Sequence, residues 1–462
     1  MTVRTRRTAV ALLAAILTLT TAACADVAAS PPPRLDGVWR SDGYGTVVSI
    51  TDGGRRLRTW ETTAVSCLPG APEVKGDGSG RFTDGEGSGL TVSRDGTGRL
   101  RLAFDESVGH RVLRRAALPA RCAEPRTTDP RRVFDVFWQT YAENYPFFAA
   151  HGVDWRAVRD RYRPRVTAHT SDDELFAILR KMIEPLHDGH TSITDGADRN
   201  YGGHRADTVM PTRESIARTD KAVAEAVGVP LRSWAQGAVS YADLPDGLGY
   251  LRITRFTRFA AKGGPAADAA ELDRALDAVL TPARVRSLRG LVLDLRFNGG
   301  GSDRLGIRVA ERLTDRPYVA YLKHARSDPR NPRRFTPEVP VRVNPHDGPV
   351  YTGPLAVLTG RLTISAGETT TQALMGRSPA PTRIGENTQG SFSDVLERSL
   401  PNGWRFGLPN EEFMTADPQR RTYDVTGIPP AVRTPVFTEE EFAAHKDSAL
   451  TRARQLLAVG RG

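Results

Sequence analysis

The sequence predicts an α/β core preceded by a helical segment and a small β-rich N-terminal domain. Residues 35–125 alternate apolar and polar side chains between clusters of Gly and Asp, which is typical of antiparallel strands. Apolar side chains then recur at helical spacing over residues 133–141. Further on, two apolar runs at residues 248–256 and 290–301 flank a helical stretch at 266–280. Strand, helix and strand at this spacing favour a parallel sheet, which is the basis of the α/β assignment.

The first 34 residues have the pattern of an export signal followed by a tether. A basic start precedes an apolar stretch at residues 9–19 and small residues that end at Cys24. The apolar stretch is too short to remain as a membrane-spanning helix. Small residues directly before a cysteine resemble the signal of bacterial lipoproteins, which implies removal of residues 1–23 and lipidation of Cys24. The paired arginines of the basic start also fit a twin-arginine export route.

We therefore expect residues 24–34 to be a lipidated tether. The expected location is the extracytoplasmic face of the cell membrane, reached through this lipid anchor, or the secreted fraction. The membrane surface is accordingly one expected partner.

Two cysteines remain once Cys24 is assigned to the lipid. In an exported protein we expect Cys67 and Cys122 to form a disulfide, which would stabilise the fold by about 4 kcal/mol in the chain-entropy model. The alternative is a pair of unpaired buried thiols.

The chain has a formal net charge of +10 that comes almost wholly from arginine. Only six of its 64 basic residues are lysine, and the 54 acidic residues are spread throughout. No basic stripe interleaved with aromatic residues occurs, so we expect no nucleic-acid partner. Attraction to an anionic membrane or wall surface remains open.

The remaining elements follow in order along the chain. A capping-box pattern, Ser171 with Glu174, begins a second helix that should end near residues 185–188. Residues 324–350 are rich in Arg and Pro without periodicity, and we predict a long surface excursion there, either a lid or a solvated loop. The expected divisions are the β-rich domain at 35–125, the helical segment at 126–200, a connecting segment at 201–245 with one helix at 215–227, the α/β core at 246–440 and a C-terminal helix at 441–462.

Ser365 is the first candidate for chemistry. It follows a short apolar run at residues 354–359, predicted to be a buried strand, and precedes a predicted helix at 366–375. A serine in such a turn places its hydroxyl at a helix N-terminus, where free backbone N–H groups favour developing negative charge. The alternative is an ordinary N-cap, since serine is a preferred residue there.

Several motifs in a fixed order resemble the tail-specific and tricorn-type serine peptidase family. They extend the resemblance over roughly residues 133–435. The matching strings are LHDGHTS at 186–192, GLVLDLRFNGGG at 290–301, TISAGE at 363–368, RIGENTQG at 383–390 and DVTGIPP at 424–430. The resemblance implies a ClpP/crotonase-like core and peptide-bond hydrolysis through an acyl-enzyme on Ser365. It also implies polypeptide substrates in unfolded or extended form, without a metal or organic cofactor.

Members of this family activate the serine with either a lysine or an upstream histidine. Here Ser391 stands where the lysine would be, and no lysine occurs between Ser365 and Lys446, so a serine–lysine dyad in that arrangement is excluded. His190 matches the histidine of the tricorn-type members, and a neutral imidazole suits a general base. His187 could instead pair with His190 in a metal site, but no further ligands stand at suitable spacing, so we expect no metal.

A base of this kind usually needs an acceptor that orients its ring. By resemblance that residue is Asp424, one methylene shorter than the usual glutamate, and Gly189 stands where tricorn-type members have a relay serine. Asp188 is a second candidate, and Asp424 also suits a plain turn. By the same resemblance, the oxyanion hole consists of the N–H groups of Ala366 and Gly300.

The glycine-rich turn that contains Gly300 has an alternative as a flexible turn or phosphate cradle, although it lacks the lysine of a P-loop. We expect Asp294 and Arg296 to support this turn. Only residues 191–248 separate the histidine motif from the next strand, too few for a PDZ domain, so selection of substrates by their C-termini is not expected. Two other functions stay open: a ligand- or peptide-binding envelope lipoprotein without turnover, and a small-molecule esterase or amidase.

Overall fold

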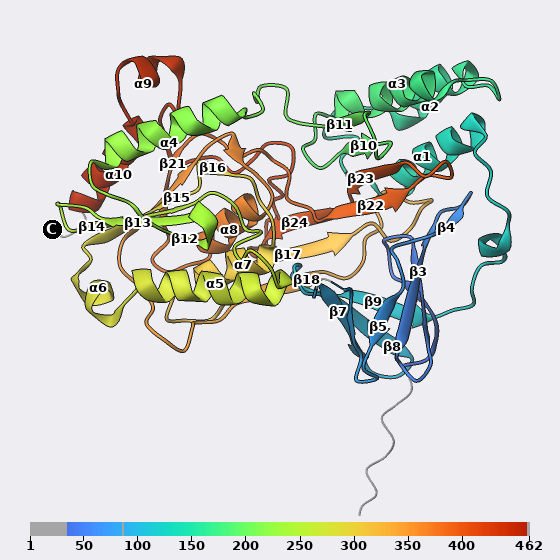
Figure 1. The fold of residues 1–462 in the computed structure, drawn as a ribbon, viewed down its shortest axis with the longest axis horizontal. Helices are drawn as coiled ribbons and strands as arrows, with labels where there is room; N and C mark the ends of the chain where they lie inside the picture. Colours follow the sequence, from blue (N-terminus) through green and yellow to red (C-terminus); the bar gives the residue numbers. More distant parts are fainter. Residues whose placement is uncertain (1–34, 86, 460–462) are drawn as a thin grey trace, which may run out of the picture. The chain divides into compact units, whose positions relative to one another are not determined.

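The computed structural model describes residues 35–85 and 87–459 (Figure 1). These described residues form one compact unit. The export signal, the tether and the lipidation site at Cys24 lie outside the described residues. None of the helices in the described ranges has both the length and the apolar character needed to span a bilayer.

A closed antiparallel β-barrel makes up the N-terminal domain. Its strand order is β2-β1-β9-β8-β7-β6-β5-β3-β4, and β2 also pairs with β3, which closes the sheet. Alternate residues such as Val48, Leu57 and Leu102 point inward and are buried. This confirms the β-rich domain. The strands are β1 Gly37–Ser41, β2 Thr46–Thr51, β3 Arg56–Thr62, β4 Cys67–Pro69, β5 Val74–Gly76, β6 Arg81–Thr83, β7 Gly89–Arg94, β8 Arg99–Phe104 and β9 Arg111–Arg115.

A disulfide joins the barrel to the segment that leaves it. Cys67 begins β4, and Cys122 lies in a short 3₁₀ turn, Ala120–Ala123, with the two Cα atoms 4.8 Å apart. The predicted pairing of these two cysteines is confirmed, and it ties the end of the barrel to the start of the helical segment.

Three helices follow: α1 Pro130–Asn144, α2 Trp155–Tyr162 and α3 Asp172–Ile183. The capping box at Ser171 and Glu174 is present at the start of α3. The segment is not wholly helical, because the strands β10 Ser192–Thr194 and β11 Asn200–Gly202 extend the hairpin of β22 and β23. That hairpin consists of Val395–Ser399 and Arg405–Pro409. Aromatic packing between α1 and β23, for example Phe137 on Phe406, fixes this sheet against the helices.

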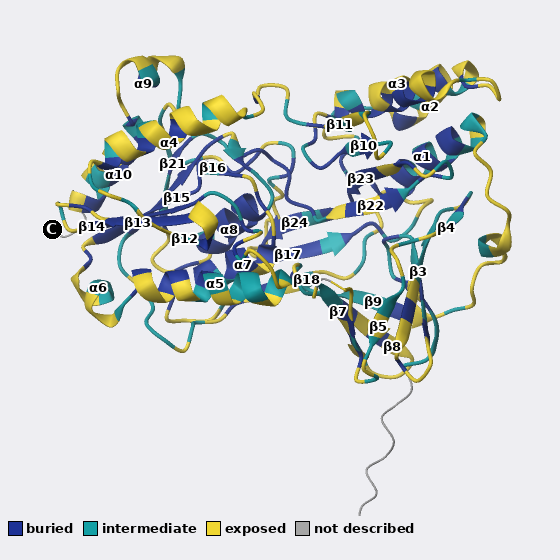
Figure 2. Ribbon diagram, viewed as in Figure 1, coloured by how far each residue is buried: buried dark blue, intermediate teal, exposed yellow. Residues whose placement is uncertain are grey.

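The core is a seven-stranded sheet in the order β12-β13-β14-β15-β19-β21-β25. β14 and β15 pair in parallel across α5, and β19, β21 and β25 continue the parallel part, as predicted for an α/β core. Helices α5 and α10, the latter Ser448–Val459, cover opposite faces, so β15 and β19 are buried throughout (Figure 2). The bounds are α4 Arg213–Val227, β12 Arg232–Trp234, β13 Val239–Asp243, β14 Leu248–Ile253, α5 Gly264–Val279, α6 Pro282–Ser287, β15 Gly290–Asp294, β19 Leu355–Thr359, β21 Thr382–Gly385 and β25 Val432–Arg433.

The predicted surface excursion at residues 324–350 is wrong in part. The structure places β17 Tyr318–Ala325 and β18 Val339–Val343 here, in a three-stranded sheet with β24 Glu411–Thr415. Val339, Val341 and Val343 do alternate with Pro340 and Arg342 at strand period, but the Arg- and Pro-rich surroundings hide this short pattern. The residues between the two strands remain a loop.

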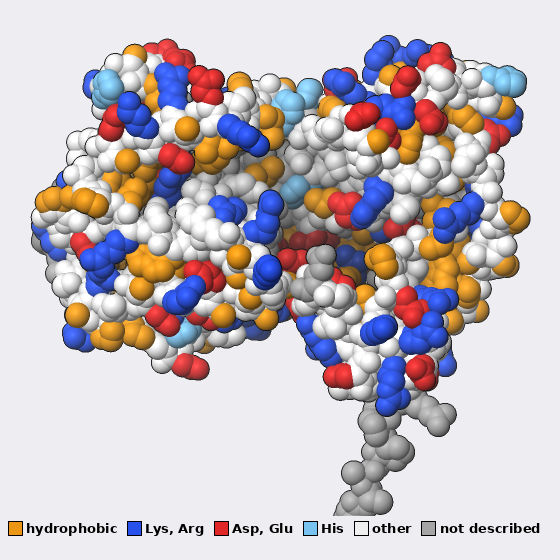
Figure 3. Space-filling view, in the orientation of Figure 1, with side chains coloured by type: hydrophobic (Ala, Val, Ile, Leu, Met, Phe, Trp, Pro, Cys, Tyr) orange, Lys and Arg blue, Asp and Glu red, His pale blue; other side chains and the backbone are white. Residues whose placement is uncertain are grey.

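The C-terminal segment holds two helices instead of the single predicted one. Helix α9, Glu439–Ala443, is followed by α10, Ser448–Val459. Asp447 lies between them, and its carboxylate accepts the N–H of Leu450 and so caps the start of α10. On the face drawn in Figure 3, basic and acidic side chains are intermixed over the surface.

Candidate active site

Ser365 occupies a sharp turn between the short strand β20, Leu362–Thr363, and helix α8, Ala366–Met375. Its backbone has φ 55° and ψ −121°, a left-handed conformation that a residue with a side chain rarely adopts. An ordinary N-cap residue has extended dihedrals, so this turn differs from a simple helix start. Ser365 is only partly buried and lies at the positive end of the α8 dipole.

The carboxylate of Glu368 holds this turn. It is fully buried and accepts three backbone N–H groups: Gly390 at 2.7 Å, Ser391 at 2.8 Å and Ser365 at 3.3 Å. Burial raises the pKa of Glu368 to about 7, although these hydrogen bonds act in the opposite direction. Glu368 is not among the site residues predicted from the sequence. Its signal was the Ser-x-x-Glu spacing within TISAGE, which is a capping-box pattern.

Ser391 connects the serine turn to the loop that contains the histidine. Its carbonyl oxygen accepts the N–H of Ser365 at 3.1 Å, and its Oγ accepts the N–H of Gly189 at 3.1 Å. A Cβ at position 189 would lie 2.8 Å from Ile364 Cδ1, so the end of that side chain would have to shift to admit one. This close packing favours glycine at the position of the relay serine.

His190 is buried beside this connection. Burial lowers the pKa of its imidazole below the ordinary 6.5, against opposing effects of the carboxylates of Asp188 and Asp394. Its Nδ1 has no hydrogen-bond partner among the described residues. Within the described residues, no hydrogen bond joins His190 to Ser365. Their two segments are connected only indirectly, because both are hydrogen-bonded to Ser391. His187 is exposed, so the two histidines lie in different environments.

The two candidate orienting carboxylates both bind other groups. Asp188 accepts the backbone N–H of His190 at 2.9 Å and the hydroxyl of Tyr145 at 2.9 Å, which shapes the histidine loop. Asp424 accepts the hydroxyl of Thr422 at 2.6 Å and the N–H of Phe392 at 3.3 Å. Within the described residues neither carboxylate makes a hydrogen bond to the imidazole.

Burial raises the pKa of Asp424 well above its usual range, and it is the backbone after Ser391 that this carboxyl holds in place. The structure therefore gives Asp424 a supporting position next to the site. It does not bring it to the histidine ring.

The two predicted oxyanion donors differ in their surroundings. Ala366 is buried at the first position of α8, where a helical N–H has no intrahelical partner. Gly300 lies against the serine, since a Cβ at this glycine would come within 2.7 Å of Ser365 Cβ. Its φ of 79° also requires glycine. However, its N–H donates to Asn298 Oδ1 at 3.0 Å, so this structure shows only Ala366 with a free donor.

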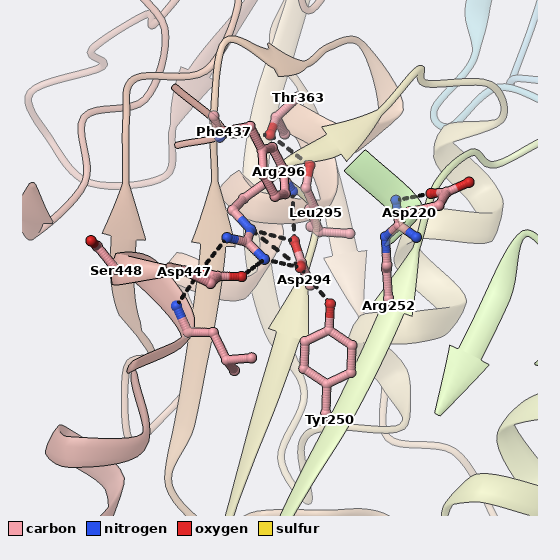
Figure 4. Close-up of polar contacts among 12 residues, drawn as sticks. Asp220, Tyr250, Arg252, Asp294, Leu295, Arg296, Thr363, Phe437, Asp447 and Ser448 are labelled. Carbon is pink, nitrogen blue, oxygen red and sulfur yellow. Dashed lines mark hydrogen bonds and ion pairs between the residues drawn. The ribbon is translucent and has the colours of Figure 1, made fainter. Parts of the chain in front are cut away.

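A buried ionic network supports the strand that leads to the Gly300 turn (Figure 4). Arg296 binds Asp294 at 2.7 Å and Asp447 at 2.6 Å, and Tyr250 donates to Asp294 at 2.6 Å. Although burial opposes it, the Arg296 guanidinium holds the pKa of Asp294 below its ordinary value. These residues support the turn from behind, as the sequence analysis expected.

The described residues contain no group of three or more His, Cys, Asp or Glu placed to hold a metal ion. The buried lysine of the core, Lys323, is paired with Asp394 and Glu411 at 3.3 and 3.2 Å. Tyr44 and Ser107 of the barrel also bind these carboxylates.

Comparison with known proteins identifies two regions. Residues 247–434 match the sequence model of Peptidase family S41, and residues 126–184 match that of the Tricorn protease C1 domain. A crystal structure from Parabacteroides merdae, provisionally named a peptidase, is similar with 26% identity and a TM-score of 0.60, over 73% of this chain and 98% of that one. Mature CPAF is similar in fold alone, with 12% identity and a TM-score of 0.50, over 72% of this chain and 96% of that one. No curated protein matches the chain.

These matches, together with the fold, define a serine peptidase. Residues 247–434 form a core that matches Peptidase family S41, with a segment at residues 126–184 ahead of it that matches the Tricorn protease C1 domain. The predicted family and the predicted α/β fold with an N-terminal β-rich domain are thereby confirmed.

Proposed function

We propose that Ser365 is the nucleophile of this peptidase and that His190 is its general base. In the proposed reaction, His190 takes the hydroxyl proton while Ser365 Oγ attacks the scissile carbonyl, and the proton then passes to the leaving amine. Water hydrolyses the acyl-enzyme by the same route. The N–H of Ala366 stabilises the oxyanion, joined by that of Gly300 once it leaves Asn298.

The observation that carries this proposal is the bridge through Ser391. One residue binds both the strained serine turn and the loop that contains His190, over a separation of about 200 positions. The buried Nδ1 of the imidazole has no partner among the described residues, which suits a ring that exchanges protons during catalysis. Catalytic hydrogen bonds often tighten only when substrate binds, so a separated serine and histidine are compatible with this role.

A fluorophosphonate probe tests the proposal, because it labels only an activated serine. The purified chain should label, and Ser365→Ala and His190→Ala should each reduce labelling and casein digestion on the order of 10⁴-fold or more. Ser287→Ala and His187→Ala are matched controls at exposed positions and should behave as wild type.

Labelling that survives in Ser365→Ala would overturn the nucleophile. A chain that folds but never labels would favour the binding protein without turnover. Labelling with hydrolysis of small esters, but not of unfolded casein, would favour the esterase or amidase.

We also propose that the peptidase is exported and held at the membrane by lipid on Cys24, where it acts on extended or unfolded polypeptides. The support is the signal-like N-terminus together with a disulfide, which is typical of oxidising compartments. Palmitate labelling and membrane fractionation of the full chain test it, with Cys24→Ala as the variant. Equal membrane recovery of the variant would contradict the anchor.

A further inference from the structure

A cavity of about 500 Å³ lies in the N-terminal barrel and opens at its end, and none of its lining residues is close to Ser365 in the sequence. This volume falls within the range of small-molecule binding sites. The cavity lies inside the closed sheet and at its end, where the β22–β23 hairpin packs. Its barrel lining comes largely from alternate, inward-facing positions of the strands.

Both apolar and charged side chains line this cavity. On β3 the inward positions are Leu57, Thr59 and Glu61, and on β9 they are Leu113 and Arg111. The register sets charged and apolar positions side by side, because Glu61 pairs with Leu68 and Arg111 pairs with Leu102. The charged groups therefore lie next to leucines of the lining. The apolar lining includes Val48, Leu57, Leu68, Val74, Leu90, Leu102, Phe104 and Leu113.

Two arginines of the lining have no carboxylate partner among the described residues. Arg111 places its guanidinium 4.0 Å from the centre of the Tyr44 ring and 4.8 Å from that of Phe104. Arg398 is 7% exposed and donates only to carbonyl oxygens, those of Glu397 and Tyr44. Neither forms an ion pair within the residues that the structure describes. Burial lowers the pKa of Arg398 to about 10, which reflects a poorly compensated positive charge.

The acids of the lining do not neutralise these arginines. Four arginines line the cavity against two glutamates. Glu397 pairs with Arg405 at 3.7 Å, and Glu61 accepts the N–H of Ser399 at 2.7 Å. Burial raises the pKa of Glu61, so its negative charge is itself disfavoured. The site therefore combines an apolar lining with an excess of positive charge.

We propose that this barrel binds a single-chain amphiphile with an anionic head group, of which a fatty acid is the simplest. The alkyl chain occupies the leucine-lined interior, and the carboxylate lies between Arg111 and Arg398. This site is separate from the peptidase chemistry and does not depend on which residues perform it.

The test uses 11-(dansylamino)undecanoate as a fluorescent probe on the purified chain. We expect saturable fluorescence enhancement that dodecanoate displaces. Octanoate should displace it on the order of 100-fold more weakly, because four methylenes fewer are buried. 1-Dodecanol should be at least about 10-fold weaker than dodecanoate, since it lacks the charge.

Arg111→Gln and Arg398→Gln should each weaken dodecanoate binding about 10-fold and leave 1-dodecanol unchanged. Arg99→Gln, on the outer face of β8, is the matched control and should bind like wild type. If circular dichroism shows that Arg398→Gln does not fold, Arg111→Gln alone serves as the test variant. Absence of probe binding, equal affinity for the acid and the alcohol, or unchanged acid affinity in folded Arg111→Gln would each overturn the proposal.

Discussion

The carbonyl oxygen of Ser391 accepts the backbone N–H of Ser365 at 3.1 Å. Ser391 stands where lysine-dependent relatives are expected to have their base, yet here it supplies structure and not a proton acceptor. Its backbone holds the serine turn and its side chain holds the histidine loop at Gly189. The two halves of the proposed catalytic pair thus depend on one small residue.

Ser391→Ala should slow fluorophosphonate labelling about 10-fold. The variant keeps the backbone bond to Ser365 but leaves the N–H of Gly189 without its acceptor, at a cost of about 1–3 kcal/mol. The measurement is the labelling rate together with the denaturation midpoint. Ser287→Ala controls for loss of a hydroxyl, and an unchanged rate in Ser391→Ala would show that the bridge is dispensable.

Glu368 should make the fold less stable as pH rises. The pKa of the Glu368 carboxyl is about 7 in the folded chain, compared with 4.5 for an unperturbed glutamate. The folded state therefore binds the carboxyl proton more tightly than the unfolded state does. Stability is therefore lost between about pH 4.5 and 7, by about 3 kcal/mol. Denaturant unfolding across this window should show the slope in wild type and a reduced slope in Glu368→Gln. Glu124→Gln, at an exposed site, should retain the wild-type slope.

The labelling rate should fall on the acid side with a midpoint below pH 6.5. Burial lowers the pKa of His190, so the neutral base persists to lower pH than in a free imidazole. Asp188→Asn should move the midpoint further down, because the carboxylate of Asp188 opposes that shift. A midpoint above pH 6.5, or a decline of the labelling rate at low pH that persists in His190→Ala, would show that another group causes the decline.

Asp447→Asn should cost about 3–5 kcal/mol of stability. The change leaves the buried guanidinium of Arg296 without one of its two carboxylates. Denaturant unfolding measures this loss in the free energy of unfolding. The exposed ion pair of Arg218 and Glu439 supplies the control. Glu439→Gln should cost no more than about 1 kcal/mol, since exposed ion pairs contribute little. Equal effects of the two variants would contradict a special role for the buried network.

Removal of the disulfide by Cys67→Ser should destabilise the chain by about 4 kcal/mol, because the bond closes a loop with a sequence separation of 55. Dithiothreitol should lower the unfolding midpoint of the wild type and leave that of the variant unchanged. A wild type insensitive to reductant under denaturing conditions would argue that the bond adds nothing to stability.

Local patterns predicted much of this fold. Helix α8 begins at Ala366 and ends at Met375 as expected, and the parallel pairing of β14 with β15 follows from their spacing across α5. Strand β18 was missed because its five residues lie in Arg- and Pro-rich surroundings. Closure of the barrel depends on β1 pairing with β9, eight strands later in the chain, which no local window contains.

The site was predictable as residue types but not as contacts. Ser365 and His190 are recognisable from motifs, whereas the bridge at Ser391 joins segments about 200 positions apart. Glu368 has a readable capping pattern, but its bonds to Gly390 and Ser391 arise only in the folded chain. The partners of Asp424 likewise depend on tertiary packing, so its motif position alone could not establish what it binds.

The absence of a side chain at Gly189 constrains how this peptidase can change. A Cβ there would lie 2.8 Å from Ile364 Cδ1, so a relay serine requires the end of the Ile364 side chain to move. A smaller residue at position 364 would remove this contact. Sequence variation at these two positions should therefore be correlated among relatives of this chain, with glycine accompanying a bulky neighbour.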